Sequence, residues 1–96
     1  MPTPQSPLPV THNPSANRFE AGGEGHLAVC EYTTEGARRV FTHTYVPPEW
    51  RGRGLAEQLV RAALDDTRRR GLKAVAACSY VAAFVARHPE DQDLLA

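Results

Sequence analysis

The segment from Val46 to Ala56 carries residue types that bind anions. It contains two arginines and two glycines in alternation, Arg51-Gly52-Arg53-Gly54. A β-branched and aromatic run, residues 40–46, leads into the segment, and a helical pattern begins at its end. The first N–H groups of a helix have no partner inside the helix, and they attract negative charge. Because no Ser, Thr, Asp or Asn lies between Arg51 and Gly54 to cap that helix, the segment predicts a phosphate-binding turn.

The strands that must position this turn are predicted from alternation and turn residues. Runs at residues 18–21, 26–32 and 39–46 predict three strands, joined by turns at 22–25 and 33–36 into an antiparallel meander. Pro47 and Pro48 end the third strand, because proline cannot donate to a ladder. Residues 72–77 predict a fourth strand, parallel to the third through a right-handed crossover.

Two helices complete the predicted fold. Apolar residues at helical spacing from Ala56 to Thr67 predict the first, with Gly71 just beyond its end. Residues 80–88 predict the second, with Ser79 as its cap and Pro89 as its stop. The order β-β-β-α-β-α predicts an α+β fold with helices packed on a central mixed sheet. Proline-rich residues 1–16 predict a disordered N-terminal tail, and residues 17–96 predict one domain. Residues 91–96 predict a short C-terminal tail whose Leu94 and Leu95 dock back onto the fold.

Composition excludes several classes of function. The chain has 11 Lys and Arg residues and 11 Asp and Glu residues, and this zero net charge argues against general nucleic-acid binding. Six of the arginines, however, fall between residues 51 and 70. The run Arg68-Arg69-Arg70 predicts a solvated helix face. Two cysteines and four scattered histidines predict neither a disulfide framework nor a metal site. We expect a soluble, cytoplasmic monomer, because no membrane span, signal peptide or leftover apolar stripe is visible.

The turn matches the acetyltransferase pattern better than the other phosphate loops. A Walker loop needs a lysine that is absent, and a dinucleotide fingerprint needs three glycines in a longer chain. Arg51-x-x-Gly54-x-Ala56 matches the Gln/Arg-x-x-Gly-x-Gly/Ala pattern of the GNAT acetyltransferase superfamily. Four segments together resemble a minimal, single-domain GNAT subfamily over residues 17–95: His43-Thr44-x-Val46-Pro47-Pro48-Glu49, Arg51-Gly52-x-Gly54-Leu55-Ala56, Cys78-Ser79-Tyr80-Val81 and Arg87-His88-Pro89-Glu90.

The resemblance implies that the chain binds acetyl-CoA, without a metal, and acetylates an unidentified amine. The pantetheine arm would lie along the third strand near Tyr45 and Val46, where the two parallel strands would splay. Ser79 would also contact the coenzyme. The pyrophosphate would sit on the turn formed by Arg51, Gly52, Arg53, Gly54, Leu55 and Ala56. Like the subfamily, the chain lacks the longer N-terminal helices that shape an acceptor pocket in larger relatives.

Three residues are candidates for the chemistry. Larger relatives protonate the departing thiolate with a tyrosine just after the later parallel strand, where this chain reads Cys78-Ser79-Tyr80. Cys78, whose pKa a helix N-terminus would lower, could take the acetyl group or act as acid. Tyr80 could be the acid, and His43 could be a base for the amine. Each candidate also has a structural alternative: Cys78 and Tyr80 could simply pack, and His43 could be a hydrogen-bonded structural histidine. Cys30 alternates with other core positions of its strand, so it is predicted to face the core.

The sequence therefore predicts an acetyl-CoA-dependent N-acetyltransferase. The alternative is a non-catalytic acyl-CoA-binding module, because the sequence shows no acceptor pocket. A basic nucleic-acid binder has only the arginine run in its favour, and the neutral charge opposes it.

Overall fold

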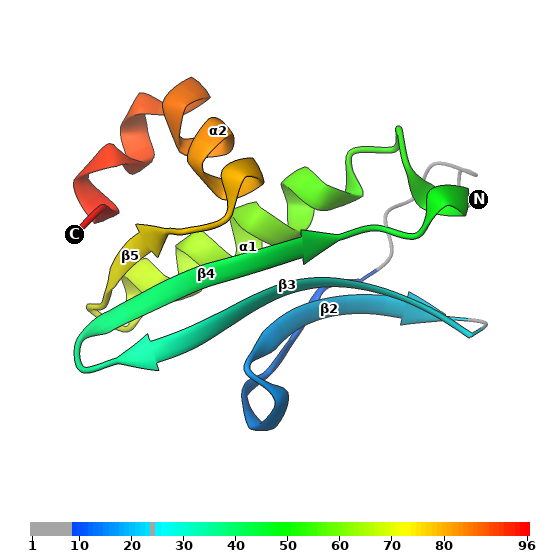
Figure 1. The fold of residues 1–96 in the computed structure, drawn as a ribbon, viewed down its shortest axis with the longest axis horizontal. Coiled ribbons are helices and arrows are strands. Elements are labelled where there is room, and N and C mark those ends of the chain that lie inside the picture. The colour runs from blue at the N-terminus through cyan, green and yellow to red at the C-terminus, as the bar shows by residue number, and fades with distance from the viewer. Residues whose placement is uncertain (1–8, 24) are drawn as a thin grey trace.

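The protein is built around one five-stranded mixed sheet. The computed structural model describes residues 9–23 and 25–96. The spatial order of the strands, β1-β2-β3-β4-β5, equals their order in the chain (Figure 1). The first four pair antiparallel, and β5 pairs parallel to β4, so the predicted meander and crossover strand are confirmed. The strands are β1 (Thr11–Asn13), β2 (Arg18–Gly23), β3 (His26–Glu35), β4 (Arg38–Tyr45) and β5 (Lys73–Ala76).

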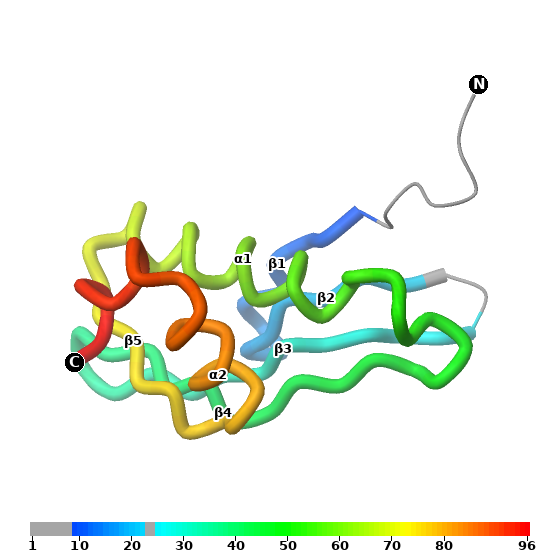
Figure 2. The backbone as a smooth tube through the Cα atoms, turned by 90° about the horizontal axis from the view of Figure 1, so that it is seen from above, coloured from blue at the N-terminus to red at the C-terminus, as the bar shows by residue number. Residues whose placement is uncertain are grey.

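Two α-helices pack on this sheet, as the sequence predicted. Helix α1 (Leu55–Arg69) connects β4 to β5 and lies along one face of the sheet (Figure 2). Helix α2 (Ser79–Arg87) follows β5 and adds Val81, Phe84 and Val85 to the same core. In the apolar stripe predicted for α1, Leu59, Val60, Ala63, Leu64 and Thr67 are buried, whereas Ala56 is only partly buried and its neighbour Leu55 is buried instead. None of the helices in the described residues is long and apolar enough to cross a membrane.

The structure adds a strand inside the predicted N-terminal tail. Residues 1–8 lie outside the described residues, but Thr11–Asn13 forms β1 at the edge of the sheet. The ring of His12 stacks on Phe19 with centroids 4.1 Å apart, and its Nε2 lies 2.6 Å from the Tyr32 hydroxyl. These contacts depend on residues distant in the chain, so the proline-rich local composition could not predict them.

The element boundaries also differ at two turns. Strand β3 runs through the predicted turn at 33–36, and the chain reverses only at Gly36, which has φ of 61°. The predicted tail at 91–96 begins as a 3-10 helix, Pro89–Leu94. The predicted docking is confirmed for Leu94, which is buried, whereas the Leu95 side chain is exposed although its backbone forms a bridge to Ala74 of β5. His88 closes α2, with Nδ1 2.7 Å from the Phe84 carbonyl oxygen.

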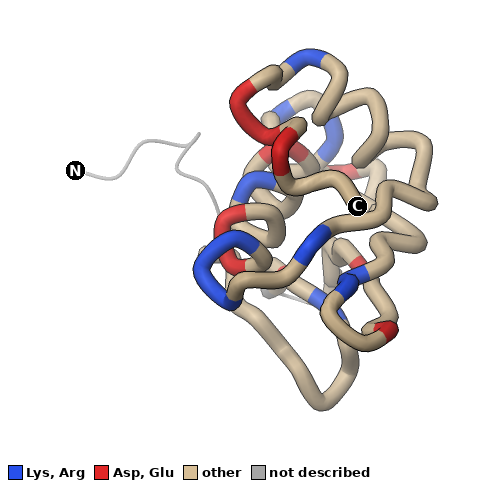
Figure 3. The backbone as a smooth tube through the Cα atoms, turned by 90° about the vertical axis from the view of Figure 1, so that its left-hand side faces the viewer, with Lys and Arg blue, Asp and Glu red and all other residues tan. Residues whose placement is uncertain are grey.

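Acidic side chains neutralise the arginines at the C-terminal end of α1. Arg39 of β4, which is buried, donates to Asp66 Oδ2 at 2.9 Å, and Arg70 donates to the same oxygen at 2.7 Å. Arg68 forms a two-pronged contact with Asp93 at 2.8 and 2.9 Å. Basic and acidic segments accordingly lie close together on this side of the molecule (Figure 3). The predicted solvated arginine face is exposed, but its charges are largely paired.

Candidate functional site

The candidate site lies where β4 and β5 part. Their parallel ladder spans Arg38–Phe41 on β4 and ends at Ala76 on β5. One more hydrogen bond, from Cys78 N–H to the Phe41 carbonyl at 2.8 Å, holds the strands together before the chain turns into α2. Strand β4 continues to Tyr45, paired with β3 alone (Figure 1). The edge of β4 beyond Phe41 therefore faces an opening between the strands, which agrees with the expected splay.

The chain after β4 folds into a tight turn that exposes the start of α1. Pro48–Trp50 forms one turn of 3-10 helix, and Gly52 and Gly54 then adopt φ of 80° and 77°. Glycine takes this left-handed conformation at low cost because it has no Cβ. Gly54 is the N-cap of α1, and it supplies no side-chain cap. The first N–H groups of α1 therefore lack a side-chain acceptor, as the sequence predicted.

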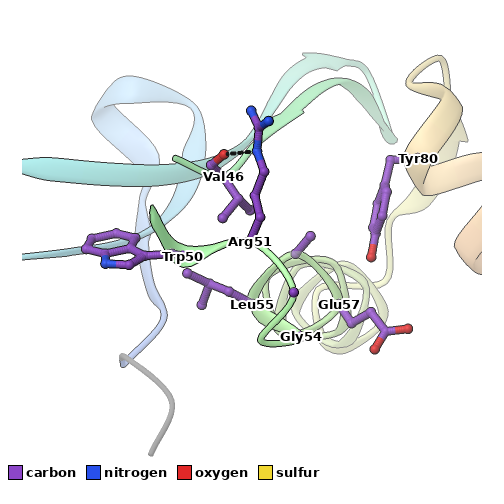
Figure 4. A pocket seen from close by; sticks show the side chains of 9 residues that line it. Val46, Trp50, Arg51, Gly54, Leu55, Glu57 and Tyr80 are labelled. Carbon is purple, nitrogen blue, oxygen red and sulfur yellow. Dashed lines mark hydrogen bonds between the residues drawn. The ribbon is translucent and has the colours of Figure 1, made fainter. Parts of the chain in front are cut away.

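A cavity of about 270 Å³ opens beside this turn (Figure 4). Arg51 forms part of its wall and is fixed by a hydrogen bond from its Nε to the Val46 carbonyl at 2.8 Å. Tyr80 reaches the cavity from α2, opposite the first turn of α1. Positive backbone dipoles and a cationic side chain thus border a largely apolar hollow. The lining residues are Val46, Trp50, Arg51, Gly52, Gly54, Leu55, Ala56, Glu57 and Tyr80.

Cys78 is the N-cap of α2 and lies mostly buried at the splay. Burial raises the pKa of its thiol, but hydrogen bonds from the Thr44 hydroxyl and from the backbone of Val81 and Tyr80 lower it further, so the net pKa is below the ordinary value. The prediction that Ser79 caps α2 is wrong. Ser79 is the first residue of the helix, and the capping position belongs to Cys78.

Tyr80 has the opposite ionisation behaviour. Burial, and after it the negative charge of Glu57, raises the pKa of its phenol above the usual value. The hydroxyl therefore keeps its proton at neutral pH. Cys78 and Tyr80 lie two residues apart at the start of α2, so one short segment presents an acidified thiol and a protonated phenol.

A β-bulge decides which side chain of β4 approaches Cys78. Tyr32 of β3 pairs with Phe41, but two residues earlier Cys30 pairs with Thr44. Regular pairing would have put His43 opposite Cys30, so β4 contains one extra residue at this point. Thr44 Oγ1 consequently lies 3.5 Å from Cys78 Sγ. His43 projects to the other face, because neighbouring residues of a strand alternate, and its ring stacks on Tyr45 with centroids 6.4 Å apart.

The structure thus gathers some of the predicted site residues and separates others. Val46, Arg51, Gly52, Gly54, Leu55, Ala56 and Tyr80 line the cavity. Arg53, Ser79 and Tyr45 are exposed and do not line the cavity. Tyr45 nevertheless lies near it, because its ring centroid is 5.8 Å from the guanidinium of Arg51. Cys30 is fully buried, as its alternation predicted. Sequence reasoning did not assign Glu57 or Thr44 to the site. The place of Glu57 in the first turn of α1 could be predicted from the helical pattern, whereas the approach of Thr44 to Cys78 depends on the bulge.

Comparisons with known proteins agree with this geometry. The family model for GCN5-related N-acetyl-transferases matches residues 18–94. Protein NATD1 of Gallus gallus is 37% identical over 91 residues, covering 92% of this chain and 83% of that protein. Protein NATD1 of Xenopus tropicalis is 35% identical over 94 residues, covering 95% of this chain and 86% of that protein.

A solved structure shares the fold over nearly the whole chain. The solution NMR structure of a GCN5-like candidate N-acetyltransferase from Staphylococcus aureus superposes with a TM-score of 0.75 at 26% identity. The match covers 95% of this chain and 90% of that one. The α+β sheet with a splayed parallel pair defines an acetyltransferase-type fold. The chain belongs to the GCN5-related N-acetyltransferase family.

Proposed function

We propose that this protein binds acetyl-CoA and transfers its acetyl group to an amine. The observation that carries the proposal is the juxtaposition of the cavity at the Arg51–Ala56 turn with Cys78 and Tyr80 at the splay. The turn fits a pyrophosphate, because the start of α1 is uncapped and Arg51 and Arg53 form no ion pair within residues 9–23 and 25–96. The free edge of β4 offers backbone hydrogen-bonding groups to an extended arm.

The pKa shifts support different roles for Cys78 and Tyr80. Acetyl-CoA supplies an acetyl group activated as a thioester. The lowered pKa of Cys78 favours the thiolate, whose sulfur would form a bond to the acetyl carbon while the coenzyme's carbon–sulfur bond breaks. Tyr80, which keeps its proton, would protonate the departing thiolate. The amine would then take the acetyl group from Cys78 and return a proton to Tyr80, so that both side chains regain their starting state.

Replacing the two cysteines separately tests this assignment. Cys78→Ala should abolish acetyl transfer in a thiol-release assay over a panel of amines, with nearly unchanged acetyl-CoA affinity by calorimetry. Cys30→Ala, at the buried cysteine, is the matched control and should retain transfer once folding is verified. Tyr80→Phe should slow transfer about 100-fold. Full activity of Cys78→Ala would remove Cys78 from the mechanism.

Two binding outcomes separate the alternatives. Mass spectrometry after incubation with acetyl-CoA should show an acetyl adduct on Cys78. Coenzyme binding without an adduct and without transfer to any amine would favour the non-catalytic acyl-CoA-binding module. That alternative was raised because the sequence lacks the N-terminal helices that shape an acceptor pocket in larger relatives. No measurable coenzyme binding would overturn both. Three features stay predictions from the sequence: membership of the small subfamily with the Cys-Ser-Tyr-Val motif, a monomeric state and a cytoplasmic location.

A further inference from the structure

The two cysteines of the chain share a single hydroxyl group. Thr44 Oγ1 lies 3.5 Å from Cys78 Sγ and 3.9 Å from Cys30 Sγ. Thr44 stands on β4, Cys30 on β3 and Cys78 at the start of α2, so the hydroxyl joins three elements at the point where the sheet opens. A threonine hydroxyl has one hydrogen to donate, and it can therefore serve one sulfur at a time.

The environments of the two sulfurs decide which one receives that hydrogen. Burial, the main cause, raises the pKa of the Cys30 thiol to about 12, so Cys30 stays neutral. A neutral thiol sulfur is a weak acceptor, whereas a thiolate is a strong, charged one. Once Cys78 loses its proton, the Thr44 hydroxyl therefore donates to Cys78. Cys30 on β3 is the titratable group that shares the Thr44 hydroxyl with Cys78, whereas His43 projects from the opposite face of β4.

The bulge in β4 is what makes this contact possible. Without the extra residue, the imidazole of His43 would occupy the position opposite Cys30, and Thr44 would project to the outer face. The bulge thus places a neutral, short donor beside the sulfur in place of a titratable ring. Bulges often re-aim a side chain next to active sites in this way.

We propose that Thr44 is a positioning residue that holds the Cys78 thiolate by hydrogen bonding and so sets its reactivity. The part of this proposal that concerns acetyl transfer rests on the proposed function, whereas the effect on thiolate reactivity does not. Thr44 touches the reactive sulfur through one hydroxyl group, and the role follows from that hydroxyl alone.

The test compares alkylation of Cys78 in matched threonine variants. Iodoacetamide labelling, quantified at Cys78 by peptide mass spectrometry across a pH series, reports the thiolate directly. Thr44→Val keeps the β-branched shape and removes the hydroxyl, and it should slow labelling at pH 7 about tenfold and move the pH profile upward. Thr44→Ser keeps the hydroxyl and should remain close to wild type. Thr42→Val, on the same strand but bonded toward the Glu31 carbonyl, is the control and should change nothing.

The outcomes distinguish this proposal from the proposed function. Equal labelling rates and pH profiles for wild type and Thr44→Val would overturn the role of Thr44, as would a Thr44→Ser variant that is as slow as Thr44→Val. If Thr44→Val fails to fold by circular dichroism, Thr44→Ala provides the same comparison. If wild type transfers no acetyl group, the proposed function fails, yet the labelling series still decides whether Thr44 acts on Cys78. If wild type is active, Thr44→Val should lose turnover while its acetyl-CoA affinity stays the same.

Discussion

The two ends of α1 use arginine in opposite ways. At its C-terminal end, the charges of Arg69 and Arg70 meet Asp66, and that of Arg68 meets Asp93. Before its N-terminus, Arg51 and Arg53 form no ion pair within the described residues, and the turn that carries them borders a cavity. An arginine-rich stretch that looks uniform in the sequence therefore contains two populations. One population stabilises the fold, and the other leaves positive charge available for a ligand.

The largest expected effect concerns the stabilising end. Asp66→Ala should lower the free energy of unfolding by about 3–5 kcal/mol, because it leaves the buried guanidinium of Arg39 without its carboxylate. Urea denaturation monitored by circular dichroism measures the change. The control is Asp65→Ala, whose partner Arg61 is partly exposed, and it should cost about 1 kcal/mol or less. Similar small losses for both variants would contradict the assignment of Asp66 as the organising charge.

A moderate effect is expected at the other end. Arg51→Gln should weaken acetyl-CoA binding about tenfold, because it removes a charge from the cavity wall. Arg70→Gln removes a charge of the same sign from the paired end and should leave the affinity unchanged. Calorimetry at two salt concentrations makes the comparison, and wild-type affinity should fall at higher salt. Equal losses for both variants would mean that general positive charge, and not the turn, attracts the coenzyme.

The smallest expected effect is a pH dependence of stability at the paired end. Burial, the main cause, lowers the pKa of His12 below 6.5, and the nearby arginines add to this against the opposing charge of Asp66. The unfolded chain therefore binds the His12 proton more readily than the folded chain. This contribution to stability is complete above pH 6.5 and declines as the pH falls below it.

Asp66 contributes in the same direction at lower pH. Burial raises the pKa of its carboxyl, but Arg39 and Arg70 lower it further, to a net value below 3.8. Its contribution is present above that ordinary value and is lost as the pH falls through the lower, folded value.

Urea midpoints measured at pH 7.5, 6.5 and 5.5 test the contribution of His12. They should decline for wild type and decline less for His12→Gln. Parallel slopes for the two proteins would show that His12 does not couple to unfolding.

The sequence predicted the parts of the molecule that depend on local pattern. The period change after Val46 located α1, and the glycines of the turn indicated where its N-terminus would be open. Strand β1 was missed because His12 is held by Phe19 and Tyr32, and no local periodicity encodes those contacts. The pairing of Arg68 was missed for the same reason, because its partner Asp93 lies on another element. Asp66, which pairs with Arg69 and Arg70, lies at helical spacing on the same helix, but its further contact with the buried Arg39 of β4 has no local signal.

The candidate site divides along the same line. Residues of the turn were predicted to line a pocket because consecutive residues of one loop share a location, and most of them do. His43 was predicted beside the chemistry, but the bulge turns it to the opposite face. A bulge depends on the register between two strands, which a single sequence does not specify by its alternation alone. Thr44 entered the site by the same one-residue shift.

The free edge of β4 also bears on edge-to-edge association between molecules. An exposed strand edge can recruit the strand of another molecule and so start edge-to-edge aggregation. Here the edge that β5 leaves open begins after Phe41 and ends at Tyr45, and Pro47 and Pro48 prevent its extension. A stretch this short offers too few backbone groups for stable strand addition. The same stretch is long enough to align a slender ligand, so the domain can keep an open sheet edge without the usual hazard.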